Sequence, residues 1–430
     1  MKVAVIGGGY AGMAAAVTLA DAGVAVTVYE AGPHLGGRAR RVVVNGVALD
    51  NGLHILIGAY RETLALIRKV HREPARALTR LPLDWRIHRR FRLKAAPLPA
   101  PLHLVAGLAT ARGAPWRERL AAARFMSAMR ACKFRLPRDV VVSELLDAHA
   151  QGAAFTRYLW HPLCVAALNT PPQIASAQVF LNVLRDGLSA ERAAGEVLLA
   201  RVDLTELFPG PASAYLHARG GAVHTGRTVE TLAQQGTSVT LRMRDGEVAY
   251  DHVICAVSPH RAAALLSGLP GMTQASAMLE AFRYQPIHSV YLQFAQPVRL
   301  PAPMLGFEGT AQWLFDRDAI CGQRGLVAAV ISTRGAHEVL PQDELARLVH
   351  GELDREFGPL PALQWHRVIA EKRATFECSV GLARPSTRTA LAGLHLAGDY
   401  TESGYPATLE AAVRSGIAAA RQVLEQPAKL

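Results

Sequence analysis

The sequence predicts an α/β protein with a parallel β-sheet at its centre. In the first thirty residues, an apolar strand (Val3–Ile6) runs into a glycine-rich turn, a helix-forming stretch (13–22) and a second apolar strand (24–29). This order is typical of two parallel strands joined by a helix. Near the C-terminus, a further short apolar strand (394–397) precedes a helical stretch that runs to about Leu424, which repeats the strand-and-helix pattern.

The glycine-rich turn carries the pattern of a dinucleotide-binding site. Gly7 allows the tight turn, Gly9 lets a pyrophosphate approach the backbone, and Gly12 lets the helix pack closely on its strand. The helix that follows presents free N–H groups and the positive end of its dipole to the phosphates, and Ala11 in the turn is also expected to contact the cofactor. Glu30 ends the second strand about 20 residues further on, where a carboxylate can accept hydrogen bonds from an adenosine ribose.

Two further elements indicate FAD rather than a nicotinamide dinucleotide. A second glycine turn, Gly36–Gly37, is followed at once by Arg38. The arginine can neutralise a diphosphate, and the glycines let the loop lie against the cofactor. At the other end of the chain, the strand 394–397 ends in Gly398 and Asp399, whose carboxylate could hold the ribityl chain of a flavin.

The C-terminal helix is expected to complete the flavin site. Pro406 suits the first turn of this helix, and Thr408 lies in the same segment. The helix N-terminus would face the pyrimidine edge of a flavin, where reduction develops negative charge. Since no cysteine is present in 403–405, where some amine oxidases attach their flavin, the FAD is expected to be non-covalent.

Taken together, these motifs resemble the amine-oxidase and carotenoid-desaturase superfamily of FAD enzymes over the whole chain. Four blocks are similar to one branch, the hydroxysqualene dehydroxylases: 50–61, 162–171, 371–376, and 397–401 with 406–410. The resemblance implies reductive removal of an allylic hydroxyl from hydroxysqualene, giving squalene for hopanoid biosynthesis. Oxidative desaturation of a phytoene-type carotenoid precursor is the alternative, followed by an amine or protoporphyrinogen oxidase.

The resemblance also implies roles for individual residues. Val229 would contact the adenine through its backbone, while His54 and Tyr405 would lie near the isoalloxazine and are the candidates for catalysis. A purely structural role remains open for both. Lys372 is either a flavin-side lysine or part of an ion-paired scaffold with its charged neighbours. The aromatic cluster before the second block either lines the cavity or packs in the core; it comprises Tyr158, Trp160 and His161.

The expected organisation is two discontinuous domains. A Rossmann-like FAD-binding domain of the glutathione-reductase type, with a β-meander, takes 1–60, 209–274 and 376–430. Short strands are expected near Ala222 and at 228–232, 238–244 and 247–250, the last two joined by the hairpin signal Asp245-Gly246, and they precede an apolar strand at 252–257. An α+β substrate domain takes 61–208 and 275–375. Its first part is expected to be mostly helical, and strands at 289–294 and 326–332 are expected to form the floor of a substrate cavity.

The net charge of +12 is concentrated in one segment. From Arg61 to Arg138 there are 19 Lys and Arg against 4 acids, a local balance of +15. This segment contains an apolar stretch (95–109) with Leu102, Leu104 and Leu108, too short and too rich in proline to span a bilayer. It indicates peripheral contact with an anionic membrane surface, or alternatively a basic face around an ordinary packed loop. No nucleic-acid motif is found, so a nucleic-acid partner is not expected.

The five cysteines bear on redox compartment and metal binding. They form no CxxC pair and are odd in number, so we expect thiols in a reducing cytoplasm and no metal site. A single dinucleotide fingerprint is present, so reducing power for the flavin is expected from an external electron donor or reductase. The expected substrate partner is a hydrophobic isoprenoid.

Overall fold

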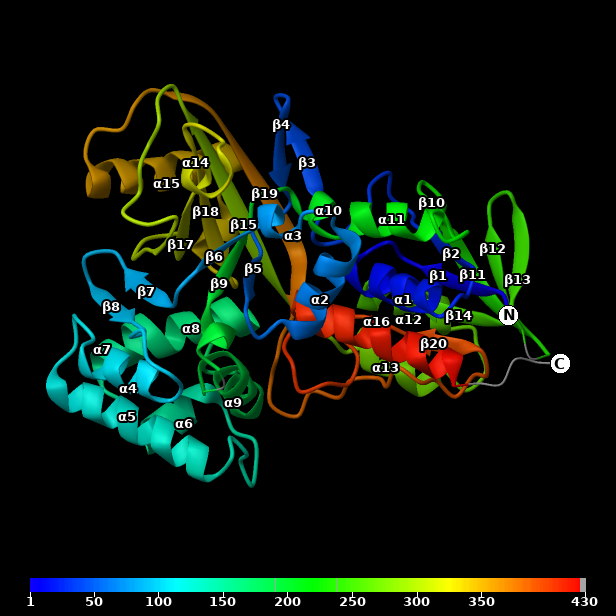
Figure 1. Ribbon diagram of the computed structural model, residues 1–430, viewed down its shortest axis with the longest axis horizontal. Helices are drawn as coiled ribbons and strands as arrows, with labels where there is room; N and C mark the ends of the chain where they lie inside the picture. Colours follow the sequence, from blue (N-terminus) through cyan, green and yellow to red (C-terminus); the bar gives the residue numbers. More distant parts are fainter. Residues whose placement is uncertain (190, 237, 426–430) are drawn as a thin grey trace.

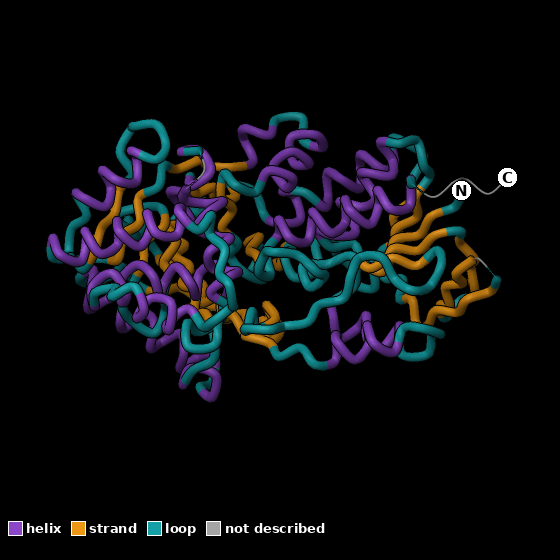
Figure 2. The backbone as a smooth tube through the Cα atoms, turned by 90° about the horizontal axis from the view of Figure 1, so that it is seen from below, coloured by secondary structure: helices purple, strands orange, loops and turns teal. Residues whose placement is uncertain are grey.

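The computed structural model describes residues 1–189, 191–236 and 238–425. A parallel sheet and its helices form one end of the molecule, where the N-terminus lies (Figure 1). The other end combines a mixed sheet with a group of helices. Seen from below in Figure 2, the strands of the first end lie side by side, and helices dominate the opposite end.

The parallel sheet confirms the predicted α/β fold. Its strands are β1 (Val3–Ile6), β2 (Val26–Tyr29), β10 (Ala222–His224), β14 (His252–Cys255) and β20 (Leu394–Leu396), in the order β10-β2-β1-β14-β20. Every neighbouring pair is parallel. The N-terminal and C-terminal segments therefore contribute strands to one sheet, on either side of β14.

The two faces of this sheet are covered by different layers. Val3 and Val5 of β1 pack against helices α1 (Tyr10–Asp21) and α16 (Leu409–Leu424), whereas the alternate residues Ala4 and Ile6 belong to the core on the opposite face. That alternation is the period of a β-strand. The second face is covered by a meander, as predicted: β11 (Val229–Gln235), β12 (Ser238–Met243) and β13 (Gly246–Tyr250).

The contact between α1 and α16 is unusually close. A Cβ on Gly416 would lie 2.1 Å from the carbonyl oxygen of Ala11, so only glycine fits there. The alanines of α1 favour a helix and have small side chains, which permits this approach. The first and last helices of the chain are thereby fixed together beneath the sheet.

A seven-stranded mixed sheet forms the second part. Its strands are β7 (Asp84–Ile87), β8 (Phe91–Lys94), β15 (Tyr284–Phe294), β16 (Met304–Gly306), β17 (Trp313–Asp316), β18 (Leu326–Ser332) and β19 (Leu363–Phe376), in the order β19-β15-β18-β17-β16-β7-β8. One face packs on helix α15 (Gln342–Phe357) through residues such as Val290 and Leu292. The other face carries Trp313, Phe315 and Val330 toward the hairpin of β3 (Arg41–Val44) and β4 (Val47–Asp50).

The segment 61–208 is helical for the most part, as expected, but it also contains strands that the sequence did not predict. The helices described in this segment are α2 (Arg61–Val70), α3 (Pro74–Ala77), α4 (Leu102–Ala109), α5 (Trp116–Ala131), α6 (Val142–Ala148), α7 (Ala153–Phe155), η1 (Thr156–Trp160), α8 (His161–Leu168), α9 (Ala177–Leu184), η2 (Arg185–Ser189), η3 (Arg192–Gly195) and α10 (Leu204–Leu207). The other helices not yet named, which follow residue 208, are α11 (Pro209–His217), α12 (Pro259–Leu266), α13 (Thr273–Glu280), α14 (Arg317–Cys321) and η4 (Ala336–Val339). The unpredicted strands include β6 (Leu78–Leu81) and β9 (Val197–Ala200), which pair with β5 (Ile55–Ile57) in a small antiparallel sheet.

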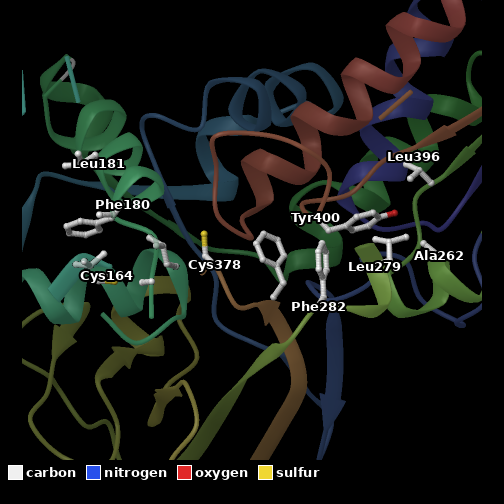
Figure 3. Packing of buried hydrophobic residues seen from close by; sticks show 14 of the residues in the cluster. Cys164, Phe180, Leu181, Ala262, Leu279, Phe282, Cys378, Leu396 and Tyr400 are labelled. Atoms are coloured by element: carbon white, nitrogen blue, oxygen red, sulfur yellow. The ribbon is translucent and has the colours of Figure 1, made fainter. Parts of the chain in front are cut away.

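One hydrophobic core runs between the two parts of the molecule. Figure 3 shows Cys164 and Phe180 of the helical region, Cys378 and Tyr400 near the centre, and Leu396 at the end of β20 in the parallel sheet. All five belong to a single cluster of buried residues. The two parts are therefore packed firmly against each other around the site described next.

Candidate functional site

A cavity of about 1210 Å³ lies between the parallel sheet and the mixed sheet. Ligand pockets are commonly about 300 to 1,000 Å³, so this one has room for a dinucleotide and part of a second molecule. Most of the residues predicted to bind the cofactor line it: Gly7, Gly9, Ala11, Glu30, Gly37, Arg38, His54, Val229, Gly398, Asp399 and Thr408. Gly12 and Tyr405 are not among the described residues that line it.

The glycines of the first turn differ in what requires them. A Cβ on Gly12 would lie 1.9 Å from the carbonyl oxygen of Gly7, so the protein itself excludes a side chain there. Gly7 has a φ of +106°, which favours glycine. At Gly9, in contrast, a Cβ would meet no protein atom closer than 3.9 Å and would project into open space beside the helix N-terminus. The empty space at Gly9 fits a pyrophosphate.

Glu30 lies at the end of β2, at the rim of the same turn. One carboxylate oxygen accepts a hydrogen bond of 2.7 Å from the backbone N–H of Gly8, and the other accepts one of 2.7 Å from Gly32. These bonds fix the carboxylate against the glycine turn. Each oxygen can accept more than one hydrogen bond, so Glu30 can still receive the hydroxyls of a ribose.

Arg38 and Asp399, which the sequence assigned to separate cofactor contacts, contact each other. A guanidinium nitrogen of Arg38 donates to the Asp399 carboxylate at 2.6 Å, and another donates to the carbonyl oxygen of Ala374 at 2.8 Å. Burial acts to lower the pKa of Arg38, but the Asp399 carboxylate outweighs it and the pKa is raised. The pair thus presents a fixed arginine and a fixed carboxylate to the cavity.

His54 and Tyr405, the two candidates for catalysis, are placed differently. Burial lowers the pKa of His54 to about 4, so the imidazole on the cavity wall is neutral at pH 7. The Tyr405 hydroxyl donates to Asp186 at 2.9 Å, and the guanidinium of Arg414 lies 4.9 Å from its ring centre. Of the two, His54 alone faces the cavity, whereas Tyr405 belongs to a polar network beside it.

Helix α16 begins later than the sequence suggested. Thr408 is its N-cap, and the Thr408 hydroxyl accepts a hydrogen bond from the N–H of Ala411 at 3.2 Å. Pro406 therefore precedes the cap, and its predicted place in the first turn is wrong. A threonine is a strong N-cap, which explains the shift of two residues toward the C-terminus. Thr408 and Leu409 line the cavity, so the N-terminus of α16 does face it.

In the half of the cavity away from the glycine turn, a group of apolar residues lies beside the polar Asn169, Ser332 and Thr375. The apolar residues come from β5, α8 and three strands of the mixed sheet: Ile55, Ala166, Ala167, Ile287, Trp313, Phe315 and Val330. Trp313 is held edge-on against Trp85, with ring centres 4.8 Å apart. The sequence predicted the strands 289–294 and 326–332 as the floor of a cavity, but it did not predict β17, which carries Trp313 and Phe315. Which side chains reach the cavity depends on which strand face meets it. The space lined by this apolar group continues directly from the dinucleotide-binding half.

The aromatic cluster and Lys372 can also be placed. Trp160 is buried in the core, and its indole N–H donates to Gln151 at 2.8 Å. Like Tyr158 and His161, it is absent from the described lining of the cavity, which agrees with the core-packing interpretation. Lys372 is exposed at the cavity rim and has no ion pair within the described residues. The predicted alternative in which Lys372 belongs to an ion-paired scaffold is therefore wrong.

Sequence reasoning missed the structural part played by Glu410. Its side chain is fully buried, and its carboxylate accepts hydrogen bonds from the N–H and the hydroxyl of Thr63 at 3.0 and 2.8 Å. It also receives a hydrogen bond of 2.7 Å from Arg414. A carboxylate at the N-terminus of α2 satisfies free N–H groups. Glu410 therefore fixes α2 against the start of α16, which borders the cofactor half of the cavity.

Comparison with known proteins defines the class. The flavin containing amine oxidoreductase family matches residues 10–424, and the chain belongs to this family of flavin-containing oxidoreductases, which implies FAD. The chain is 31% identical to hydroxysqualene dehydroxylase of Rhodopseudomonas palustris and 30% identical to that of Sinorhizobium fredii. The first match covers 98% of both chains and the second covers 99% of both. The predicted resemblance to this branch is thereby confirmed.

The fold is shared with solved structures of more distant proteins. Cyclohexylamine oxidase from Brevibacterium oxydans superposes with a TM-score of 0.69 at 18% identity, covering 99% of each chain. At this identity the similarity establishes the fold alone. The substrate must therefore be argued from the site.

Proposed function

We propose that this protein catalyses the FAD-dependent reductive dehydroxylation of hydroxysqualene to squalene. The observation that carries the proposal is the group of apolar residues in the half of the cavity that opens directly onto the dinucleotide-binding half. Walls such as Trp313, Phe315 and Val330 suit a long hydrocarbon and would bind an amine or another charged substrate poorly. The full-length similarity to hydroxysqualene dehydroxylases supports the same substrate class.

The residues of the first half of the cavity would hold the cofactor. Gly9 would admit the pyrophosphate, Glu30 would receive the ribose, and the Arg38–Asp399 pair would contact the diphosphate and ribityl groups. Since the segment 403–405 contains no cysteine, we propose that FAD is held without a covalent bond. When bound and reduced, FAD supplies the two electrons that the reaction consumes.

The apolar walls would act on the substrate rather than on the cofactor. Loss of an allylic hydroxyl leaves positive charge on carbon, and water would capture it. Ala166, Ala167 and Phe315 line the cavity with groups that hold no water, so they protect this carbon during the reaction. His54 is neutral at pH 7, so it can orient the hydroxyl by a hydrogen bond. Because it is not an imidazolium, it would not be the acid that protonates the departing hydroxyl.

A direct incubation distinguishes this proposal from the alternatives. The protein is reduced anaerobically with dithionite, incubated with hydroxysqualene or with phytoene, and the lipids are extracted. We expect squalene from hydroxysqualene and unchanged phytoene. Desaturated products from phytoene with the oxidised protein, together with unchanged hydroxysqualene, would contradict the proposal and favour a carotenoid-type desaturase.

We also propose that the protein acts at a membrane surface, where such a substrate dissolves. Within the described residues, no helix is both long and apolar enough to cross a bilayer. Large apolar side chains are nevertheless exposed on α4, on α5 and in the loop before α4, and we call them together the apolar face. This apolar face consists of Leu98, Leu102, Val105, Trp116 and Leu120.

The segment that carries the apolar face is also rich in cations without an acidic partner. Nine cations between 94 and 138 form no ion pair with the described residues: Lys94, Arg112, Arg117, Arg119, Arg124, Arg130, Lys133, Arg135 and Arg138. By contrast, Arg90 and Arg92 pair with Glu308 and Asp84. Exposed apolar side chains and cations without ion-pair partners in one segment suit the surface of an anionic bilayer.

The structure corrects the choice of membrane-contacting residues. Leu104 and Leu108 are buried, with 7% and 6% of their surfaces exposed, so they pack inside the protein and cannot contact a membrane. Leu102 is 54% exposed and is joined by Val105 at 51% and Trp116 at 66%. Because 102 and 105 are three residues apart on α4, their side chains share a face of the helix.

A further inference from the structure

A second hollow, of about 590 Å³, adjoins the flavin cavity. Four of its lining residues are cations: Arg283, Arg334, Lys372 and Arg373. Glu377 is the one acidic residue of its described lining. We call this hollow the rim pocket. Its concentration of like charge is not used by the proposed dehydroxylation.

The cations meet because three neighbouring strands end at the same place. Arg283 precedes β15, Arg334 follows β18, and Lys372 and Arg373 lie near the end of β19. The pairing of β15 with β19 is irregular between Gln285 and Ile287.

The irregularity explains how β19 presents its two cations. Gln285 pairs with Thr375 but Ile287 pairs with Glu371, so three residues of β19 (372–374) face Pro286 alone. Proline has no N–H to give to the ladder. Because β19 is not held by regular ladder hydrogen bonds at the bulge, Lys372 and Arg373 can project away from the sheet. Bulges of this kind are common beside functional sites.

No protein carboxylate neutralises these four cations. The Glu377 carboxylate accepts a hydrogen bond of 2.8 Å from the Gln285 amide, and none of the four cations forms an ion pair with any residue that the structure describes. The Arg373 guanidinium lies 5.8 Å from the ring centre of Tyr284. A concave site with several free arginines attracts anions, and phosphate matches the forked guanidinium best.

The rim pocket leads to the flavin cavity. Tyr284, Lys372 and Arg373 line both spaces. The same bulge also supplies the Ala374 carbonyl that accepts the hydrogen bond from Arg38. A ligand anchored in the rim pocket by its phosphates therefore lies beside the mouth of the cavity in which the flavin would be bound.

We propose that the rim pocket binds the phosphates of a nicotinamide dinucleotide, NADPH, which reduces the flavin. This inference rests on the proposed function, since a reductive dehydroxylation needs two electrons for each turnover. A hydride from the dihydronicotinamide and a proton from water reduce the flavin, leaving the oxidised nicotinamide. The reduced flavin then replaces the C–O bond of the alcohol with a C–H bond, and the hydroxyl leaves as water after protonation. The 2′-phosphate adds roughly −1.5 to −2 of charge at pH 7, which favours NADPH over NADH at a site with four free cations.

Binding and reduction can be measured without any isoprenoid. NADP⁺ is titrated into the FAD-loaded protein by calorimetry, and anaerobic stopped-flow absorbance then follows bleaching of the oxidised flavin by NADPH. The double variant R283Q/R334Q removes two cations that line only the rim pocket. We expect its dissociation constant for NADP⁺ to rise roughly tenfold to hundredfold, with unchanged FAD content. R347Q removes an exposed cation of α15, away from both spaces, and should bind as the wild type does.

Four results would overturn the inference. One is the absence of saturable NADP⁺ binding, and another is equal binding by wild type and R283Q/R334Q. The third is that NADPH leaves the flavin oxidised, whereas an acidic electron-carrier protein reduces it and R283Q/R334Q slows that reduction. The pocket would then be a docking site for a protein. Inorganic pyrophosphate is tested as a competitor, and binding as tight as that of NADP⁺ would contradict recognition of a dinucleotide. Hydroxysqualene is absent from these assays. A negative result here would therefore reject NADPH binding without affecting the dehydroxylase proposal, and failure to form squalene would reject the dehydroxylase proposal without affecting NADPH binding.

Discussion

The Arg38 guanidinium donates a hydrogen bond of 2.6 Å to the Asp399 carboxylate, although 361 residues separate the two. Arg38 follows the second glycine turn and Asp399 follows the last strand of the parallel sheet. The pair therefore joins the two ends of the chain at the cavity. The cofactor half of the site is complete only when both ends have folded onto the same sheet.

Breaking this pair should weaken FAD binding. In Asp399→Ala the Arg38 guanidinium loses its charged partner, and the cavity loses the carboxylate assigned to the ribityl chain. Loss of a hydrogen bond to a charged group costs about 1.5 to 3 kcal/mol, so we expect the dissociation constant of FAD to rise roughly tenfold to hundredfold. Quenching of flavin fluorescence on binding measures it.

The matched control for that variant is Glu73→Gln, which breaks the exposed Arg76–Glu73 ion pair far from the site. Exposed pairs contribute little, so its FAD affinity should equal that of the wild type. The same affinity in Asp399→Ala and the control would show that Asp399 has no part in holding the cofactor. Flavin that stays on the acid-denatured chain would contradict non-covalent binding.

Two glycine variants should separate folding from cofactor binding. A Cβ at Gly12 meets the Gly7 carbonyl at 1.9 Å, so Gly12→Ala should destabilise the protein by several kcal/mol and lower its unfolding temperature. A Cβ at Gly9 meets nothing within 3.9 Å, so Gly9→Ala should leave the stability of the FAD-free protein unchanged. It should nevertheless weaken FAD binding, because the methyl group enters the space assigned to the pyrophosphate. Full FAD affinity in Gly9→Ala would contradict this placement.

The half-buried His54 predicts how stability depends on pH. Its pKa is about 4 in the folded protein and about 6.5 when unfolded, so the unfolded chain binds more protons between these values. Stability is therefore lost as the pH falls from 6.5 toward 4 and rises with pH across this window. His54→Gln should remove up to about 3 kcal/mol of this dependence. Urea unfolding of the FAD-free protein at pH 4.5 and 7 measures it, with the exposed His217→Gln as control. An unchanged difference between the two pH values would rule out a half-buried, neutral His54.

The apolar face predicts binding to anionic vesicles. Replacing Leu102, Val105 and Trp116 with serine should weaken sedimentation with vesicles at every salt concentration, because these side chains are exposed. Raising the salt to 1 M shortens the Debye length to about 3 Å and should weaken binding of the wild type. Val339→Ser changes an apolar side chain that is 85% exposed elsewhere, and it should bind as the wild type does. Equal sedimentation of the triple variant and the wild type would favour an ordinary packed surface.

That most of the residues assigned to the cofactor line one cavity follows from the sequence, because their positions depend on local order. Strand, glycine turn, helix and acid follow one another within thirty residues, so Gly9 and Glu30 could be assigned before their surroundings were known. The C-terminal Asp399 could be found in the same way, at the end of a short apolar strand. Its hydrogen bond to Arg38 could not be, since nothing local indicates a partner so distant in the chain.

The substrate half depends on contacts between distant segments. Trp313 and Val330 face the cavity only because their strands pair in one register, and a shift of one residue would turn them to the other side. Leu104 and Leu108 looked equivalent to Leu102 in the sequence, but the packing of α4 buries them. Residues 372–374 bulge because Pro286 lies opposite them, a pairing that no local pattern reveals.

The direction of electron flow tests the central claim most directly. Protein with chemically reduced FAD is mixed anaerobically with hydroxysqualene in a stopped-flow instrument, and absorbance of the oxidised flavin is followed. We predict that this absorbance returns in step with the formation of squalene. If hydroxysqualene leaves the flavin reduced, while phytoene bleaches the oxidised flavin, the protein is a desaturase and the dehydroxylase account is wrong.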